Sequence, residues 1–179
     1  MNRRKMLGWT IMAPSVVVFS SRLGSNAFAT SGGTPQVIRI DAIKVLGRVE
    51  TIGIDNGVMS APTNLALAGW YKETAPLGEP GNAVMTGYYW WSGLPALFGD
   101  LALLAPGDQV RLTGDNGHNY LYRVEWVQTY EKRTAPLQEI VGSTEKTVLT
   151  LITDAGEFDP AANAYTRSTV VRASWVEKS

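Results

Sequence analysis

The chain has 179 residues, 45% of them hydrophobic, and a formal net charge of zero, as expected for one globular domain. It contains no cysteine, which excludes disulfides, thiolate metal sites and cysteine nucleophiles, and its one histidine, His118, argues against a histidine-based metal centre. Four of the 16 basic residues and none of the 16 acidic residues lie in residues 1–29, so the remainder has 12 basic and 16 acidic residues, a net charge of about −4 that argues against binding to nucleic acid.

Residues 1–29 have the organisation of a secretion signal. A basic stretch, Asn2-Arg3-Arg4-Lys5, precedes an apolar segment at 6–20, and Ala27-Phe28-Ala29 supplies the small residues that signal peptidase prefers. The paired arginines followed by apolar residues also fit the twin-arginine export pattern. The alternative is an uncleaved membrane anchor, but the apolar segment is short of the roughly 20 residues that a span needs. We predict cleavage after Ala29, a secreted or cell-surface protein, and membrane contact only if the leader is kept.

After a linker at 30–35, residues 36–179 are predicted to form one domain of short strands separated by turns. One helical stretch is predicted at 94–104, and Gly114-Asp115-Asn116-Gly117 predicts a hairpin turn. The predicted strands, recognised by alternating or continuous apolar residues, are 36–40, 44–49, 82–89, 109–113, 119–130, 147–153 and 169–176. So many short strands with little helix indicate an all-β, closed or nearly closed barrel of about eight strands with one or two short helices. No cofactor motif is present.

Several motifs in this order resemble the class F sortases, and the resemblance extends over residues 36–176. The motifs are Ile38-Arg39-Ile40-Asp41-Ala42-Ile43, Gly69-Trp70-Tyr71, Gly78-Glu79-Pro80-Gly81-Asn82-Ala83-Val84, Leu104-Ala105-Pro106-Gly107-Asp108, Thr150-Leu151-Ile152-Thr153, Phe158-Asp159-Pro160 and Val170-Val171-Arg172-Ala173. The resemblance implies an eight-stranded sortase-type β-barrel with a groove that, in relatives, binds a sorting-signal peptide.

The resemblance also implies where the catalytic residues of a sortase would lie. Sortases use a cysteine nucleophile, a histidine, and an arginine that stabilises the oxyanion. The cysteine follows Thr-Leu-x-Thr, where this chain has Asp154, and the histidine follows a glycine, where this chain has Tyr88. Arg167 matches the arginine, unless the last strand is shifted by one residue, which would place Ser168 there and turn Arg167 to the other face.

These replacements do not support sortase chemistry. Attack by an aspartate on an amide would give an anhydride, which is far higher in energy than a thioester, and a tyrosine with a pKa near 10 is not a ready general base. We instead predict a charge-assisted hydrogen bond between Asp154 and Arg167. His118 lies beside a hairpin turn and is expected to be an exposed loop residue. A rival interpretation is a hydrolase in which Asp154 works with a second acid, such as Glu157 or Asp159.

Four consecutive aromatic residues, Tyr88 to Trp91, form the other distinctive feature. Side chains alternate between the faces of a strand, so at least two of the four should be exposed or line the groove. We take Tyr89, Trp90 and Trp91 as candidate ligand-binding residues, and the alternative is that they cover the barrel end beneath a loop. The sequence thus predicts a catalytically inactive sortase relative that binds a sorting-signal-like peptide or a cell-wall component. A regulatory or structural companion of an active sortase is the third possibility.

Overall fold

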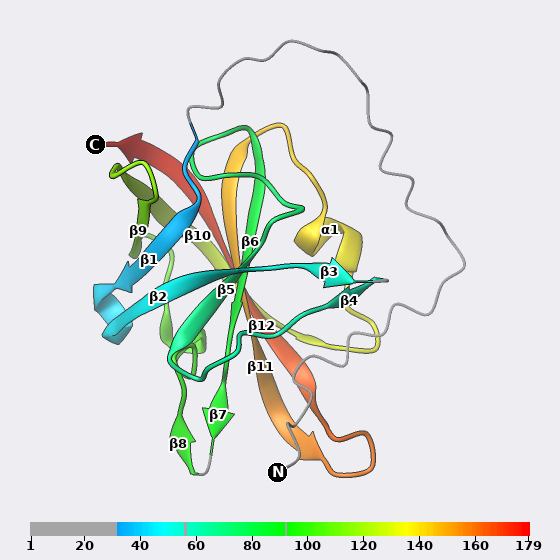
Figure 1. The fold of residues 1–179 in the computed structure, drawn as a ribbon. Coiled ribbons are helices and arrows are strands. Elements are labelled where there is room, and N and C mark those ends of the chain that lie inside the picture. Colours follow the sequence, from blue (N-terminus) through cyan, green and yellow to red (C-terminus); the bar gives the residue numbers. More distant parts are fainter. Residues whose placement is uncertain (1–31, 56, 92) are drawn as a thin grey trace.

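A closed barrel of eight strands forms the centre of the molecule (Figure 1). The structure is a computed structural model that describes residues 32–55, 57–91 and 93–179. Around the barrel the strands follow the order β1-β2-β5-β6-β11-β12-β10-β9. Their bounds are β1 Pro35–Ile40, β2 Val45–Ile52, β5 Leu67–Tyr71, β6 Gly81–Gly87, β9 Gln109–Gly114, β10 Asn119–Glu131, β11 Thr147–Asp159 and β12 Ala164–Lys178. The all-β barrel predicted from the sequence is confirmed.

The remaining elements are short. Among the described residues, two small hairpins stand outside the barrel, and the helical segments are one short α-helix and two 3-10 turns. Their bounds are β3 Ile54–Asp55 with β4 Val58–Met59, β7 Trp90–Trp91 with β8 Leu94–Pro95, η1 Asp41–Ile43, η2 Leu101–Leu103 and α1 Leu137–Val141. The helix predicted at 94–104 was wrong for most of its length, because Leu94 pairs with Trp91 in the β7–β8 hairpin and the backbone N–H groups of Ala96 and Phe98 donate to the carbonyls of Tyr89 and Tyr88.

The predicted secretion signal lies outside the described residues. In the part of the chain that the structure describes, no helix is long and apolar enough to cross a membrane.

Two of the barrel's strand pairs are parallel, β2 with β5 and β6 with β11, and the others are antiparallel. Parallel neighbours need a long connection, and the chain between β6 and β11 contains β9 and β10 and ends with α1. The side chain of Thr153 on β11 donates a hydrogen bond to the carbonyl of Gly87 at the end of β6, at 2.9 Å. The ends of these two strands are therefore fixed to each other.

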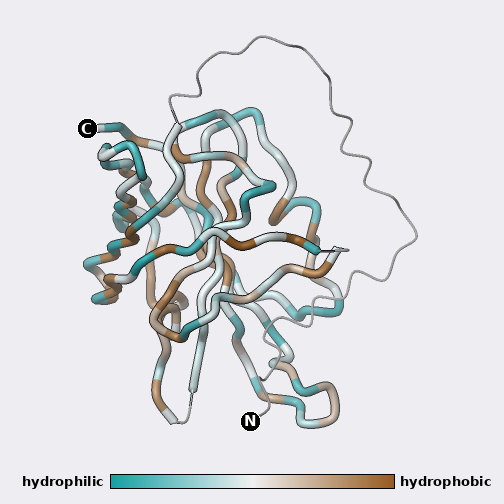
Figure 2. Tube along the Cα trace, viewed as in Figure 1, coloured by the Kyte–Doolittle hydropathy of each residue, from teal (hydrophilic) through white to brown (hydrophobic). Residues whose placement is uncertain are grey.

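The barrel interior is filled by apolar side chains from alternate positions of its strands. In β9, for example, Val110 and Leu112 are fully buried, whereas Gln109 and Arg111 between and beside them are exposed. Figure 2 shows the same alternation of hydropathy along the strands. The largest interior side chains include Ile38, Tyr122 and Leu149.

A second apolar cluster lies on the outer face of β6, β11 and β12, where Val84, Ile152 and Val170 pack against Ile140 of α1. The connection 132–146, which contains α1, covers this face (Figure 1). Buried polar groups hold the cover in place. Asn82 Nδ2 donates to the carbonyls of Ile140 at 3.0 Å and Gly142 at 3.1 Å. These bonds fix residues 132–146, which we call the cover, to the outer face of the barrel.

Candidate functional site

Asp154 lies near the middle of the long strand β11 and points to the outer face, beneath the cover formed by residues 132–146. Asp154 follows Ile152 by two residues, so the two side chains point to the same face of the strand, and Ile152 belongs to the outer apolar cluster. Its side chain is 2% exposed, and its Oδ1 lies 2.5 Å from Nζ of Lys132, whose side chain is 9% exposed. Lys132 follows directly after β10, where its backbone N–H donates to the carbonyl of Thr166 at 3.0 Å. The sequence alone gave no signal for Lys132, because it stands in a run of charged residues typical of an exposed loop.

Burial dominates the electrostatics of this ion pair. Burial raises the pKa of the Asp154 carboxyl above its usual value of 3.8, and the positive charge of Lys132 partly opposes this effect. Nearby, burial also raises the pKa of the Tyr71 hydroxyl, and the charge of Asp154 adds to the rise. Tyr71 therefore stays a neutral phenol that donates to the carbonyl of Ser60 at 2.9 Å. The site is therefore a buried ion pair between Asp154 and Lys132.

The predicted bond between Asp154 and Arg167 was wrong. The strand register pairs Asp154 with Ser168 and Ala155 with Arg167, so Arg167 points to the opposite face. There its Nε donates to Glu131 Oε1 at 2.6 Å, and both side chains are more than half exposed. Ser168 is fully buried, and its hydroxyl has no hydrogen-bond partner among the described residues. The one-residue alternative considered from the sequence is the arrangement that the structure adopts.

Tyr88 follows β6. The parallel strands β6 and β11 are paired at Thr86 and Ile152, so Tyr88 and Asp154, each two residues further along, lie beside each other. The Tyr88 ring is half-buried, and its hydroxyl donates to the carbonyl of Pro62 at 2.9 Å. The tyrosine is thus engaged with the loop before β5, and this bond does not direct its hydroxyl to Asp154.

The acids proposed for the rival hydrolase are not brought together. Glu157 and Asp159 are exposed in the β11–β12 hairpin, whereas Asp154 is buried beneath the cover. Asp159 accepts the backbone N–H groups of Ala161 at 2.8 Å and Ala162 at 3.3 Å, which is ordinary turn chemistry. His118 is exposed at the tip of the β9–β10 hairpin, as expected. No group of three or more possible metal ligands occurs among residues 32–179, the two undescribed positions apart.

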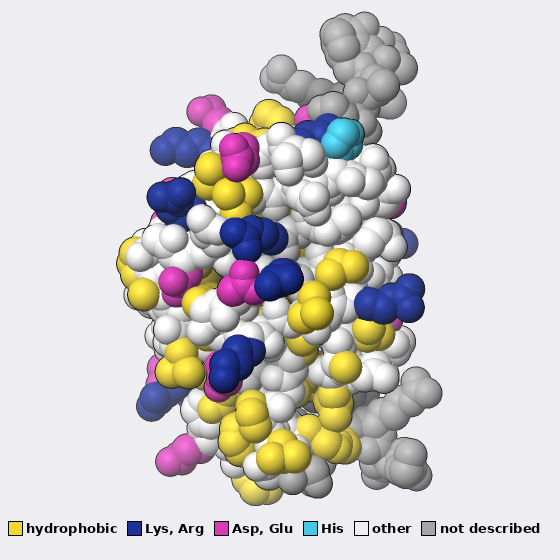
Figure 3. All heavy atoms as spheres, turned by 90° about the vertical axis from the view of Figure 1, so that its left-hand side faces the viewer, with side chains coloured by type: hydrophobic (Ala, Val, Ile, Leu, Met, Phe, Trp, Pro, Cys, Tyr) yellow, Lys and Arg dark blue, Asp and Glu magenta, His cyan; other side chains and the backbone are white. Residues whose placement is uncertain are grey.

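The aromatic residues gather at one end of the barrel, where the β7–β8 and β11–β12 hairpins extend beyond it (Figure 1). Tyr165 of β12 contacts the rings of Tyr89 and Phe158, each with centroids 5.4 Å away. Trp90 and Trp91 are 42% and 45% exposed, and Leu94 across the hairpin is 70% exposed. We call these six residues, Tyr89, Trp90, Trp91, Leu94, Phe158 and Tyr165, the aromatic end. Figure 3 shows hydrophobic side chains gathered at the lower end of the face it displays, the end to which both hairpins extend.

Comparison with known proteins supports the same fold. A family model described as the sortase domain matches residues 38–176. Sortase A of Listeria monocytogenes has a similar structure, with a TM-score of 0.63, 20% sequence identity, and coverage of 82% of this chain and 89% of that one. Sortase C-1 of Actinomyces oris gives a TM-score of 0.63 and 20% identity over 79% of this chain and 71% of its own. Sortase C1 of Streptococcus suis gives 0.62 and 19%, with 82% and 74% covered.

No curated protein sequence matches the chain. At 18–20% identity the structural neighbours establish the fold alone, whereas the family model spans most of the chain. The match of the sortase-domain model over residues 38–176 shows that this chain belongs to the sortase family.

Proposed function

We propose that this protein is a class F-like member of the sortase family that works outside the cytoplasm as a binding module and not as a transpeptidase. The observation that carries the proposal is the environment of Asp154, the residue that the resemblance aligns with the nucleophile. Asp154 is 2% exposed and in contact with Lys132, in a chain without cysteine. A nucleophile must reach the substrate carbonyl, and this carboxylate is both covered and paired.

The residues around Asp154 supply none of the other parts of the reaction. The arginine that would stabilise an oxyanion faces away, and the tyrosine at the histidine position is bonded to Pro62. Ser168, which stands opposite Asp154, has no charge to offer a developing oxyanion. The centre is therefore a structural ion pair within the family's fold.

The aromatic end is the surface that we assign to ligand binding. Large aromatic rings at the tip of a hairpin bury much area on contact and bring a polar edge to the ligand, which suits sugars and proline-containing peptides. Trp90, Trp91 and Leu94 are exposed side by side on one hairpin, and a contiguous exposed apolar surface of this kind often marks a binding site. A sorting-signal-like peptide and a cell-wall glycan are the two ligands that this surface fits.

A binding experiment on purified residues 30–179 tests the assignment. We expect the protein to sediment with isolated cell-wall sacculi or to bind an immobilised Leu-Pro-x-Thr-Gly peptide, and the double variant Trp90→Ala/Trp91→Ala to bind at least tenfold more weakly. Leu46→Ala is the matched control, because Leu46 is also an exposed apolar residue, on β2. Unchanged binding in the tryptophan variant would remove the aromatic end from the proposal.

A turnover experiment tests the loss of catalysis. We expect no cleavage or transfer of a Leu-Pro-x-Thr-Gly peptide over long incubation with an amine acceptor, measured by mass spectrometry of the peptide. Product that disappears in the Asp154→Ala variant would contradict this and would favour an acid-based enzyme.

A further inference from the structure

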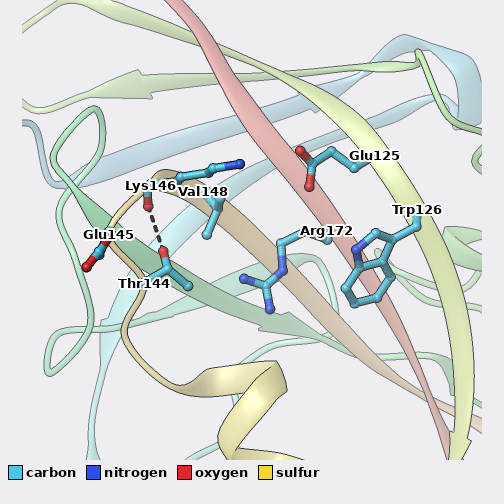
Figure 4. A pocket seen from close by; sticks show the side chains of 7 residues that line it. All are labelled: Glu125, Trp126, Thr144, Glu145, Lys146, Val148 and Arg172. Atoms are coloured by element: carbon cyan, nitrogen blue, oxygen red, sulfur yellow. Dashed lines mark hydrogen bonds between the residues drawn. The ribbon is translucent and has the colours of Figure 1, made fainter.

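An open pocket of about 400 Å³ lies on the outer face, between β10, β12, the start of β11 and the end of the cover (Figure 4). Arg172 and Trp126, which are paired residues of β12 and β10, form one side of it. Val148 lies in its floor, and Lys146 extends along its upper edge towards Glu125. Arg172 and Ser168 are four residues apart on β12, a separation of roughly 13 Å along a strand, so the pocket is distinct from the Asp154 ion pair.

Arg172 is the unusual residue of the pocket, because it is buried without a carboxylate in contact. It is only 7% exposed, and its Nη2 donates to the carbonyls of Glu139 at 2.9 Å and Ile140 at 3.1 Å. Its Nε has no hydrogen-bond partner in the described part of the chain. None of the ion pairs formed among the described residues includes Arg172. Buried arginines are normally paired with an acid, since an unpaired buried charge is costly.

The other residues that line the pocket limit which ligand could supply a negative charge to Arg172. The Arg172 guanidinium lies 5.6 Å from the centre of the Trp126 ring, which together with the buried Val148 gives the pocket an apolar surface. Lys146 is exposed and adds a second positive charge. Glu125, which accepts a hydrogen bond from the Ser174 hydroxyl, brings a negative charge to the same rim. Arg172, Lys146 and Glu125 together carry a net charge of about +1, which a single carboxylate neutralises and a doubly charged group such as phosphate would exceed.

We propose that this pocket binds a single carboxylate attached to a small apolar group, as at the C-terminus of a short peptide. The carboxylate lies between Arg172 and Lys146 and supplies the charge that Arg172 lacks, in the charge-assisted geometry that guanidinium groups favour. The apolar part lies against Trp126 and Val148. A cavity of this volume is within the range of small-molecule sites. This site shares no residue with the aromatic end, and its proposal does not depend on the ligand binding proposed there.

Nuclear magnetic resonance on purified residues 30–179 tests the proposal with N-acetyl-L-alanyl-L-alanine as the probe. The indole N–H signal of Trp126, assigned by its loss in Trp126→Phe, should shift in a saturable way with the free acid. The C-terminal amide of the same peptide should bind at least tenfold more weakly, because it lacks the charge. Equal binding of acid and amide, or no saturable shift with the acid, would overturn the proposal. Tighter binding of inorganic phosphate would also overturn it.

Two single-charge variants sharpen the test without disturbing the bonds that Arg172 makes to the cover. Lys146→Met should weaken binding of the acid several-fold, whereas Lys72→Met, which removes another exposed lysine, should not change it. Glu125→Gln removes the competing negative charge and should strengthen binding, because the amide oxygen can still accept the bond from Ser174. If Lys146→Met and Glu125→Gln both leave the affinity unchanged, the carboxylate is not bound in this pocket.

Discussion

Two ion pairs lie next to each other, one between β10 and β12 and the other between β11 and the residue that follows β10, and they differ greatly in burial. Glu131 and Arg167 pair at 2.6 Å with side chains 56% and 54% exposed. Lys132 and Asp154 pair at 2.5 Å with side chains 9% and 2% exposed. The acid of one pair and the base of the other are consecutive residues, Glu131 and Lys132. The contact distance therefore does not indicate how much a pair matters for stability, whereas the face of the sheet on which it lies decides whether the pair is buried or exposed.

The strand register creates this difference. Because consecutive residues of a strand point to opposite faces, Arg167 and Ser168 cannot both face Asp154. The pairing of Asp154 with Ser168 sends Arg167 into solvent and leaves Asp154 without its expected partner. Lys132, which leaves β10 as the chain turns into the cover, reaches back to fill that role.

The largest effect is expected from breaking the buried pair. Lys132→Met leaves the Asp154 carboxylate buried without a cation, which should lower the free energy of unfolding by about 3–5 kcal/mol at pH 7. Urea denaturation measures the change. The double variant Lys132→Met/Asp154→Leu is the control, since replacing both charges by apolar groups should recover much of the loss. A loss below about 1 kcal/mol in Lys132→Met would mean that the pair is open to water and comparable to Glu131–Arg167.

A smaller effect is expected from pH. Burial raises the native pKa of Asp154 above 3.8, so just above that pH the native state holds a proton that the unfolded chain has lost. The contribution of Asp154 to stability is therefore greatest below 3.8 and decreases as the pH rises towards its native pKa.

Urea denaturation of the wild-type protein and of Asp154→Asn, at pH values from below 3.8 upwards, isolates the contribution of Asp154 to the free energy of unfolding, since asparagine does not titrate. The free energy of unfolding of the wild-type protein relative to Asp154→Asn should fall as the pH rises. A relative stability that rises with pH would show that Lys132 outweighs burial and holds the native pKa below 3.8.

The smallest effects are expected on the exposed side. Arg167→Ala and Glu131→Ala should each change the free energy of unfolding by less than about 1 kcal/mol, because water screens the pair. A double-mutant cycle between Asp154→Ala and Arg167→Ala should give a coupling energy near zero. Strong coupling would place the two side chains on one face and would contradict the observed register.

The barrel could be predicted from the sequence because its strands are bounded by strong turn signals. The Gly114-to-Gly117 turn, for example, gives the β9–β10 hairpin that was expected. The site could be predicted only in part. The resemblance directed attention to Asp154, but the partner of Asp154 depends on a one-residue register that alternation alone cannot fix, and Lys132 is distant from it in sequence. The segment at 94–104 is apolar enough for a helix, yet the pairing of Trp91 with Leu94 overrides that preference.

The closure of the barrel has a consequence for how the chain folds as it is made. β1 completes its pairing only when β9 is present, and Val37 pairs with Thr113, 76 residues later. At a synthesis rate of roughly 5–20 residues per second, β1 waits about 4–15 s for that partner. During this time Ile38 and Ile40, fully buried in the finished protein, belong to a strand with one unpaired edge. Such long-range pairing is slow to form, so the free edge of β1 is open to pairing with other chains until β9 has been synthesised.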